Sequence, residues 1–317
     1  LILILSLSLL QPAGMTADLW LQANLRAKRA TVASWVALIA GALARLWLVS
    51  MEAGLTAFAW VSVGEGMLNG FLVWIAARQA GLPRLAPGVN PAFARALIGQ
   101  SWLLLLSGLT VMLYMRIDLV MVRHMMGDTS AGVYAAAVRF SELWYFVPGA
   151  LASSVLPGLI RHKSMGPEAY ARAMQRYYDI SAFMGYAAAL ATCLLAGPLV
   201  RLAYGLEFVG TTDILRWHAW SVVFVFLGVA RGQFLINENL GGFYLLVTTL
   251  GAGLNIALNW WLIPIHGPLG AAWATVVAYG LAAWGASWLH PRVRVNAAMQ
   301  TRALLLPLLG WRYFIRR

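Results

Sequence analysis

Four charged side chains interrupt two neighbouring apolar stretches of the sequence, and these are the residues best placed to do chemistry. They are Arg116 and Asp118 within residues 99–125, and Arg139 and Glu142 within residues 133–160. A charge at the centre of a membrane-spanning helix costs about 2.5–3.5 kcal/mol on insertion scales, so such residues usually face a bundle interior or a water-filled cavity. Two compatible interpretations are open: a functional site, or an ion pair that locks two helices together.

The spacing of these charges about a short turn at residues 126–132 predicts that they lie together. Asp118 and Arg139 are each about 9–10 Å from the outer end of their helix, at about 1.5 Å per residue. Arg116 and Glu142 are about 13–14 Å deep by the same count. We therefore expect Asp118 level with Arg139 and Arg116 level with Glu142, in one four-charge cluster that faces a cavity rather than lipid.

Other polar side chains also lie within apolar stretches. Arg45 and Arg231 are deep, and a planar guanidinium suits bidentate binding of phosphate. Glu65 is open to interpretation as a protonatable coupling site or as a buried carboxyl without such a role. Asn255 and Asn259 share one helical face and suit either sugar hydroxyls or hydrogen bonds between helices. The predicted cationic, substrate-binding cavity comprises Arg45, Arg116, Arg139, Arg231, Asn255 and Asn259, with Glu65, Asp118 and Glu142 for ion pairing or coupling.

The composition places the elements that carry these residues in a lipid bilayer. Hydrophobic residues make up 61% of the 317 and charged residues only 11%, whereas about a quarter of an ordinary globular domain is charged. The predicted fold class is an all-α polytopic membrane protein. The net charge of +12 then belongs to loops that flank spans. Because the basic residues do not interleave with aromatics on a polar face, we expect no nucleic-acid partner.

No enzymatic constellation is visible, and we predict neither an enzyme nor a cofactor. The sequence contains no HExxH, no Gly-rich phosphate loop, no nucleophile elbow and no carboxylate-rich metal cluster. The only cysteine, Cys193, lies in an apolar stretch, which excludes a disulfide framework and a Cys-based metal site.

Eight apolar stretches are long enough to cross about 30 Å of hydrocarbon at about 1.5 Å per residue. They are residues 31–51, 54–77, 99–125, 133–160, 179–203, 214–236, 241–264 and 267–289. Lys and Arg gather in alternate connections, and only the turn at 237–240 departs from this alternation. By the positive-inside rule, we expect the basic connections and the C-terminus to be cytoplasmic.

The longer connections divide the chain. We expect the remainder of an N-terminal lobe at 1–77, a cytoplasmic linker at 78–98, a six-helix lobe at 99–290 and a basic cytoplasmic tail at 291–317. Residues 1–10 are too few to cross a bilayer, so we expect a fragment that starts inside a helix, with its first lobe incomplete. Residues 161–178 suit either a helix lying at the cytoplasmic interface or an ordinary solvated connector.

Several short motifs together resemble a known family. They are Arg116-Ile-Asp118, Gly127, the run Gly132 to Glu142, Val147-Pro148, Leu156-Pro157, Asn255 to Asn259 with Ile263-Pro264, Gly270 to Thr275, and Gln22-Ala23 before a basic cluster. They are similar to those of polysaccharide-type flippases of the multidrug/oligosaccharidyl-lipid/polysaccharide exporter superfamily. The resemblance implies a two-lobe (6+6) helical transporter bundle in the bacterial inner membrane. It also implies translocation of a lipid-linked oligosaccharide of the polyprenyl-pyrophosphate type by alternating access, with H⁺ or Na⁺ as coupling ion.

Two rival functions are open. A cation-coupled multidrug exporter of the same superfamily would favour a net negative cavity, yet four deep arginines face three acids here. An integral membrane enzyme of glycan assembly, such as a polymerase or ligase, usually needs a large outer loop, and the predicted outer turns are short. Both observations favour transport of an anionic, lipid-linked glycan.

Overall fold

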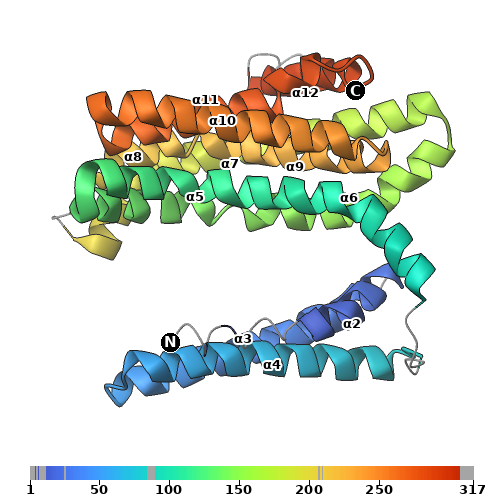
Figure 1. The fold of residues 1–317 in the computed structure, drawn as a ribbon, viewed down its shortest axis with the longest axis horizontal. Helices are drawn as coiled ribbons and strands as arrows, with labels where there is room; N and C mark the ends of the chain where they lie inside the picture. The colour runs from blue at the N-terminus through green and yellow to red at the C-terminus, as the bar shows by residue number, and fades with distance from the viewer. Residues whose placement is uncertain are drawn as a thin grey trace. The chain divides into compact units, whose positions relative to one another are not determined.

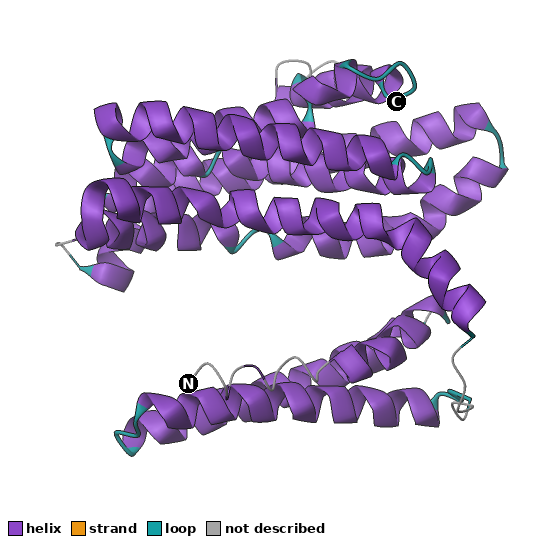
Figure 2. Cartoon of the chain, viewed as in Figure 1, coloured by secondary structure: helices purple, strands orange, loops and turns teal. Residues whose placement is uncertain are grey.

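The computed structural model describes residues 4, 6, 12–24, 26–83, 90–205, 208 and 210–307, and all regular elements within them are helices (Figure 2). The predicted all-α class is therefore confirmed for these residues. Three predictions lie partly outside the described residues. These are the incomplete helix at 1–10, residues 84–89 of the linker predicted at 78–98, and residues 308–317 of the tail predicted at 291–317.

Seven helical segments of the described residues are long and apolar enough to cross a membrane, and each predicted span corresponds to one of them or to part of one. The segment Ser101–Ser164 holds two predicted spans, because no long loop separates the helices within it. The chain is thus a multi-pass membrane protein.

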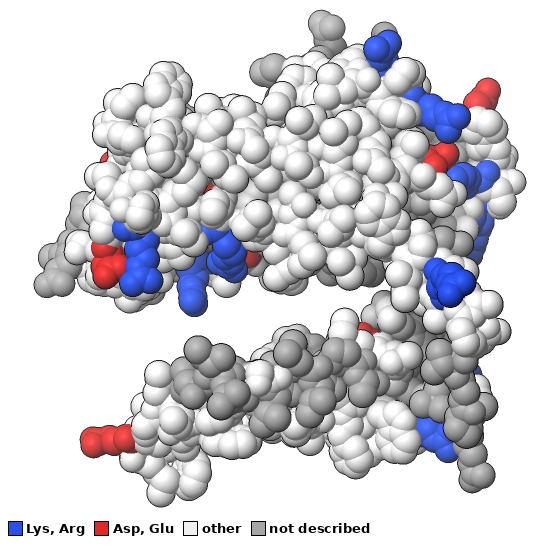
Figure 3. Space-filling view, in the orientation of Figure 1, with Lys and Arg blue, Asp and Glu red and all other residues white. Residues whose placement is uncertain are grey.

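The surface has the distribution of polarity that a bilayer requires. In Figure 3, the larger unit shows a broad uncharged band, and its charged side chains gather toward the two ends of the bundle. Large apolar side chains lie outward, among them Leu202 at 88% exposed and Trp260 at 70%. In water such a surface would be unfavourable, whereas lipid solvates it without cost.

The chain divides into two compact units, and the first is Leu1–Asn90. It contains α2 (Pro12–Ala23), α3 (Ala27–Ser50) and α4 (Leu55–Gln79). Small residues let these helices approach closely, and the buried side chains between them include Leu21, Val73 and Ala77.

The second unit is Pro91–Arg317. Its elements are α5 (Pro91–Glu142), α6 (Phe146–Ser164), α7 (Pro167–Tyr204), α8 (Thr211–His218), α9 (Ser221–Asn237), α10 (Gly241–His266), α11 (Pro268–Ala283), η3 (Gly285–Trp288) and α12 (Arg294–Leu304). Figure 1 shows its long helices running side by side, with α5 packed on α10 and α7 on α9.

The element α5 is two helices joined by a tight reversal at Gly127. This residue has φ 84° and ψ 176°, a backbone conformation that side chains with a Cβ rarely adopt. The reversal replaces the turn predicted at residues 126–132, and residues 128–142 form the second helix. It brings the two charged stretches back alongside each other.

The core of the second unit consists of separate clusters. One, here called the Tyr134 core, contains Val122, Tyr134, Ile214, Leu215 and Ile263. Another, here called the Tyr178 core, contains Leu159, Tyr177, Tyr178, Leu227 and Leu235. The helices α5 and α8 contribute to the first core, α6 and α9 to the second, and α7 to both.

Two connections differ from the sequence-based expectation. Residues 161–178 are neither a separate interfacial helix nor a solvated connector, because α6 ends at Ser164 and α7 begins at Pro167 and continues into the next span. Met174 and Tyr177 of this segment are 1% and 2% exposed within the Tyr178 core. Part of the expected tail also folds: α12 buries Asn296 and Gln300 against its neighbours.

Candidate functional site

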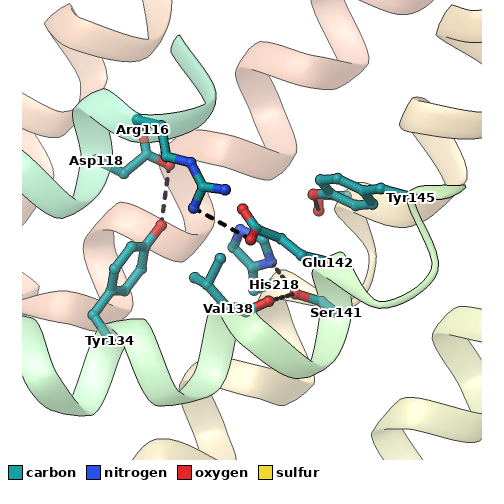
Figure 4. A network of polar contacts seen from close by, with 9 residues as sticks. Arg116, Asp118, Tyr134, Val138, Ser141, Glu142, Tyr145 and His218 are labelled. Carbon is teal, nitrogen blue, oxygen red and sulfur yellow. Dashed lines mark hydrogen bonds and ion pairs between the residues drawn. The ribbon is translucent and has the colours of Figure 1, made fainter. Parts of the chain in front are cut away.

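A small polar cavity lies between the two helices of α5, with α8 and α11 closing it (Figure 4). The volume of this cavity is about 100 Å³. The residues that line it include all four charges singled out from the sequence: Arg116, Asp118, Arg139 and Glu142, together with Tyr134, Tyr145, His218 and Tyr279. All four charges thus line one small cavity.

The deeper pair of charges is in direct contact. Arg116 Nη1 donates to Glu142 Oε2 at 3.3 Å, as their equal depth predicted. The Arg116 side chain is nevertheless 67% exposed and that of Glu142 is 20% exposed. Because the guanidinium has five N–H donors and uses one of them here, most of its binding capacity faces the open side of the cavity.

The shallower pair does not form. Asp118 is 3% exposed and has no salt bridge with Arg139. Arg139 itself is exposed and makes no hydrogen bond or ion pair with any described residue. The depth argument omitted direction: residues two apart on a helix point about 200° apart, so Asp118 faces away from the side on which Arg116 meets Glu142. The cluster is therefore one ion pair, one free arginine and one buried acid.

Neutral donors surround the Asp118 carboxylate. Oδ2 accepts hydrogen bonds from Tyr134 Oη at 3.0 Å and Thr275 Oγ1 at 2.5 Å, and Oδ1 accepts one from Asn259 Nδ2 at 3.2 Å. These donors come from the second helix of α5, from α11 and from α10. They solvate a negative charge without neutralising it, because none of the three carries a positive charge.

The two asparagines belong to this buried network rather than to an open sugar site. Asn255 and Asn259 are both 0% exposed, and Asn259 Nδ2 also donates to Asn255 Oδ1 at 3.1 Å. The interpretation as hydrogen bonds between helices is confirmed for Asn259. Asn255 Nδ2 and Asn259 Oδ1 remain buried without a protein partner, beside the Asp118 carboxylate.

Arg231 does not contribute to the cavity. It is 2% exposed and donates to the Ala282 carbonyl and to Ser287 Oγ, the latter at 3.4 Å. The Ala282 carbonyl lies in the last turn of α11, where the helix dipole is negative, so the arginine neutralises a helix end. This correction follows from packing: α9 is buried on almost every side, and its polar residues face protein.

In the first unit, Arg45 and Glu65 pair with each other. Arg45 Nη2 lies 2.6 Å from Glu65 Oε2, and Arg45 also contacts Ser62 at 3.5 Å. The carboxyl group of Glu65 lies over Gly41, at a distance that a Cβ there would obstruct. The structure therefore joins Arg45, predicted for the cationic cavity, and Glu65, predicted for ion pairing or coupling, into one ion pair between α3 and α4.

Sequence reasoning missed the residues that complete the network. Tyr134 and Thr275 bind Asp118, and His218 lies against both Tyr134 and Ser141. The only available signal was a polar side chain in an apolar stretch, which many residues share. Among the described residues, no group of three or more His, Cys, Asp or Glu side chains is arranged to hold a metal ion.

Comparison with known proteins identifies the family. A family profile described as polysaccharide biosynthesis protein matches residues 1–213 of the chain, which is most of its length and includes the cavity residues of α5. A search of curated proteins finds no match.

Proposed function

The chain belongs to the polysaccharide biosynthesis protein family, and from this premise we propose that it is a flippase for a lipid-linked oligosaccharide. Its substrate is a polyprenyl-pyrophosphate-linked glycan, which it moves from the cytoplasmic to the outer leaflet of the bacterial inner membrane by alternating access. The basic connections and the C-terminus are cytoplasmic in this proposal. The protein performs no covalent chemistry on the glycan.

The observation that carries the proposal is the pair of accessible arginines within a membrane span. Among the described residues, Arg139 has no hydrogen-bond or ion-pair partner and Arg116 has one, at the long distance of 3.3 Å. A pyrophosphate offers several anionic oxygens, and each hydrogen bond between a guanidinium and such an oxygen is worth about 1.5–3 kcal/mol. These contacts compensate for the removal of the head group from water, while the prenyl chain stays in lipid.

Glu142 gives the site a way to release its substrate. Its carboxylate competes with phosphate for Arg116, since both are anions that bind the same fork of donors. When the phosphate leaves, the ion pair forms again and the cavity does not hold an uncompensated charge. Competition from Glu142 therefore favours release of the substrate over tight binding.

Asp118 is the proposed coupling residue. A carboxylate that is 3% exposed and bound only by neutral groups is costly in a membrane unless a proton or a cation neutralises it. The oxygens of Asp118, Tyr134, Thr275 and Asn259 supply hard ligands of the kind that Na⁺ accepts, and protonation of Asp118 would serve equally. Binding and release of that ion gives the lobe two states, as alternating access requires.

The multidrug-exporter alternative is less well supported. A cationic drug would meet two accessible arginines and one paired acid at this cavity, so its binding there would be opposed by charge. The glycan-assembly enzyme lacks support among the described residues, which contain no nucleophile and base within the cavity arranged for acyl or glycosyl transfer.

The test is glycan export by the natural gene product in its own host. Arg139→Ala should lower the amount of surface glycan about 10- to 100-fold at normal protein levels and should accumulate the lipid-linked intermediate in the inner leaflet. Arg123→Ala is the matched control, because Arg123 lies on the same element, is exposed and pairs only with Asp128 at the end of the span. Normal export by the Arg139 variant would refute the proposal.

A further inference from the structure

Two membrane spans of the second unit are each interrupted by a short stretch of altered backbone hydrogen bonding. Between α5 and α6, the backbone N–H groups of Trp144 and Tyr145 bond to carbonyls only three residues back. Between α8 and α9, those of Trp220, Val222 and Val223 do the same. A short stretch of this tighter 3₁₀ pattern within a helix often marks a hinge. Pro148 explains the first interruption, because it has no N–H to donate to Trp144.

Side chains join the two interruptions. Ser141 Oγ and His218 Nδ1 are 2.7 Å apart, and Tyr145 Oη and Ser221 Oγ are 3.3 Å apart. Ser141 already donates its own proton to the Val138 carbonyl at 2.9 Å, so His218 Nδ1–H is the donor to Ser141. The first bond precedes both interruptions, and the second joins Tyr145, within the first interruption, to Ser221 at the start of α9, so the two interruptions lie at a common level.

The third helix at this level also carries a local perturbation. Thr192 of α7 donates to the carbonyl of Ala188, four residues back, and accepts a hydrogen bond from Trp144 Nε1 at 2.9 Å. Threonines that bond back to their own helix in this way often bend it. The neighbouring helix α7 is therefore contacted, by a residue of the first interruption, at a position where it can flex.

The far ends of α6 and α9 are joined as well. Lys163 Nζ, in the last turn of α6, donates to the Asn237 carbonyl at 2.8 Å and lies 2.7 Å from Glu238 Oε1. The two helices are thereby connected at both ends, and both pack in the Tyr178 core. The segments before the interruptions, residues 128–142 and α8, pack instead in the Tyr134 core.

From this arrangement we propose that α6 and α9 turn as one rigid pair about the two joined interruptions. The hinge lies between the Tyr134 core and the Tyr178 core. Glu142 is on the α5 side of the hinge and is adjacent to it, so the turn changes the opening of the cavity without breaking the Arg116–Glu142 pair. The proposal concerns motion of the chain itself and is measured without any substrate, so it stands or fails independently of the proposed function.

Spin-label distances in the full chain, reconstituted in lipid nanodiscs, test this directly. Replacing Cys193 with Ser leaves no other cysteine, and labels are then attached at exposed positions. The label pairs are Ile160 with Ile236 (α6 to α9), Thr129 with Asp213 (α5 to α8), and Ile160 with Asp213 (across the hinge). We expect two distances across the hinge and a single distance within each of the other two pairs. A single distance in all three pairs would overturn the proposal, and so would two distances between α6 and α9.

A double variant tests whether the hydrogen bonds hold the pair together. Ser141→Ala with Tyr145→Phe removes both bonds, so the α5-to-α8 pair and the α6-to-α9 pair should each acquire a second distance, with population ratios changed about five- to tenfold. The matched control is Ser107→Ala with Tyr178→Phe, because both residues are 0% exposed and hydrogen bonded away from the interruptions. An unchanged α6-to-α9 distance in the first variant, or an equal change in the control, would contradict the proposal.

Discussion

The two units of this protein each contain one arginine–glutamate pair within a membrane span, and the pairs differ in ways that separate structure from function. Arg45 and Glu65 are 2.6 Å apart, with a serine beside them and a glycine beneath the carboxyl group. Arg116 and Glu142 are 3.3 Å apart, and the arginine is 67% exposed. The first pair is the shorter one, and its arginine is 37% exposed, about half as accessible as the arginine of the second pair.

The surroundings of the two pairs differ as well. The second pair shares a cavity with an unpaired arginine, Arg139, and with a buried acid bound only by neutral donors, Asp118. Among its described residues, the first unit has no comparable cavity charge beside its pair. A charge pair within a span is therefore no evidence of function by itself. The informative property is the hydrogen-bonding capacity that the pair leaves unused.

The largest expected difference concerns an exchange of charges. Exchanging Arg116 with Glu142 places a carboxylate at the more exposed position 116, where it repels the phosphate, so glycan export should fall about 10- to 100-fold. Exchanging Arg45 with Glu65 restores the same ion pair in reverse and should leave export within about twofold. Surface glycan and protein level are measured in the same strains. Equal losses from both exchanges would remove the distinction.

Asp118 should respond to the coupling ion, and Glu65 should not. Na⁺ or protons that bind the folded protein at Asp118 raise its thermal stability, by about 2.7 kcal/mol at a concentration 100 times the dissociation constant. Melting temperatures of the purified protein, taken across Na⁺ concentration and across pH, identify the ion. Asp118→Asn should abolish the dependence and Glu65→Gln should preserve it. A dependence that survives in Asp118→Asn would place the ion elsewhere.

For stability, the order of the two pairs should be reversed: removing the acid of the first pair should cost more free energy of unfolding than removing the acid of the second. Glu65→Ala leaves Arg45 partly buried and unpaired, so the free energy of unfolding should fall by about 1–2 kcal/mol, less than for a fully buried pair. Glu142→Ala should cost under about 1 kcal/mol, because the exposed Arg116 regains solvent. Thermal or denaturant unfolding of the purified protein measures both. A larger loss for Glu142→Ala would make that pair the structural one.

The smallest effect concerns the glycine beneath the first pair. Gly41→Ala places a Cβ against the Glu65 carboxyl and should cost about 1 kcal/mol of stability. Gly64→Ala is the matched control, because nothing lies within 4 Å of a Cβ there and alanine favours a helix by up to about 1 kcal/mol. Melting temperatures should thus change in opposite directions. A shift of the same sign in both would show that Glu65 adapts freely.

Much of the site was predictable because depth follows from counting residues. The rise of a helix and the position of a turn gave the equal depth of Arg116 and Glu142, but not the direction in which each side chain points. The partners of Asp118 were not, because Asn259 and Thr275 are 141 and 157 residues away along the chain. No local sequence pattern predicts which faces of α10 and α11 pack against α5.

The sequence by itself determined that the chain is helical, that it crosses the membrane several times, and at what depth each charge lies. Hydrophobicity over about 20 residues and the fixed rise per residue suffice for these. Tertiary structure alone decided which charges remain available. It paired Arg45 with Glu65, buried Arg231 at the end of α11, surrounded Asp118 with neutral donors and left Arg139 without a partner among the described residues. The physical reason is that the rotation of a helix about its own axis is set by packing against its neighbours, and that rotation decides whether a charge meets a partner, a helix end or a cavity.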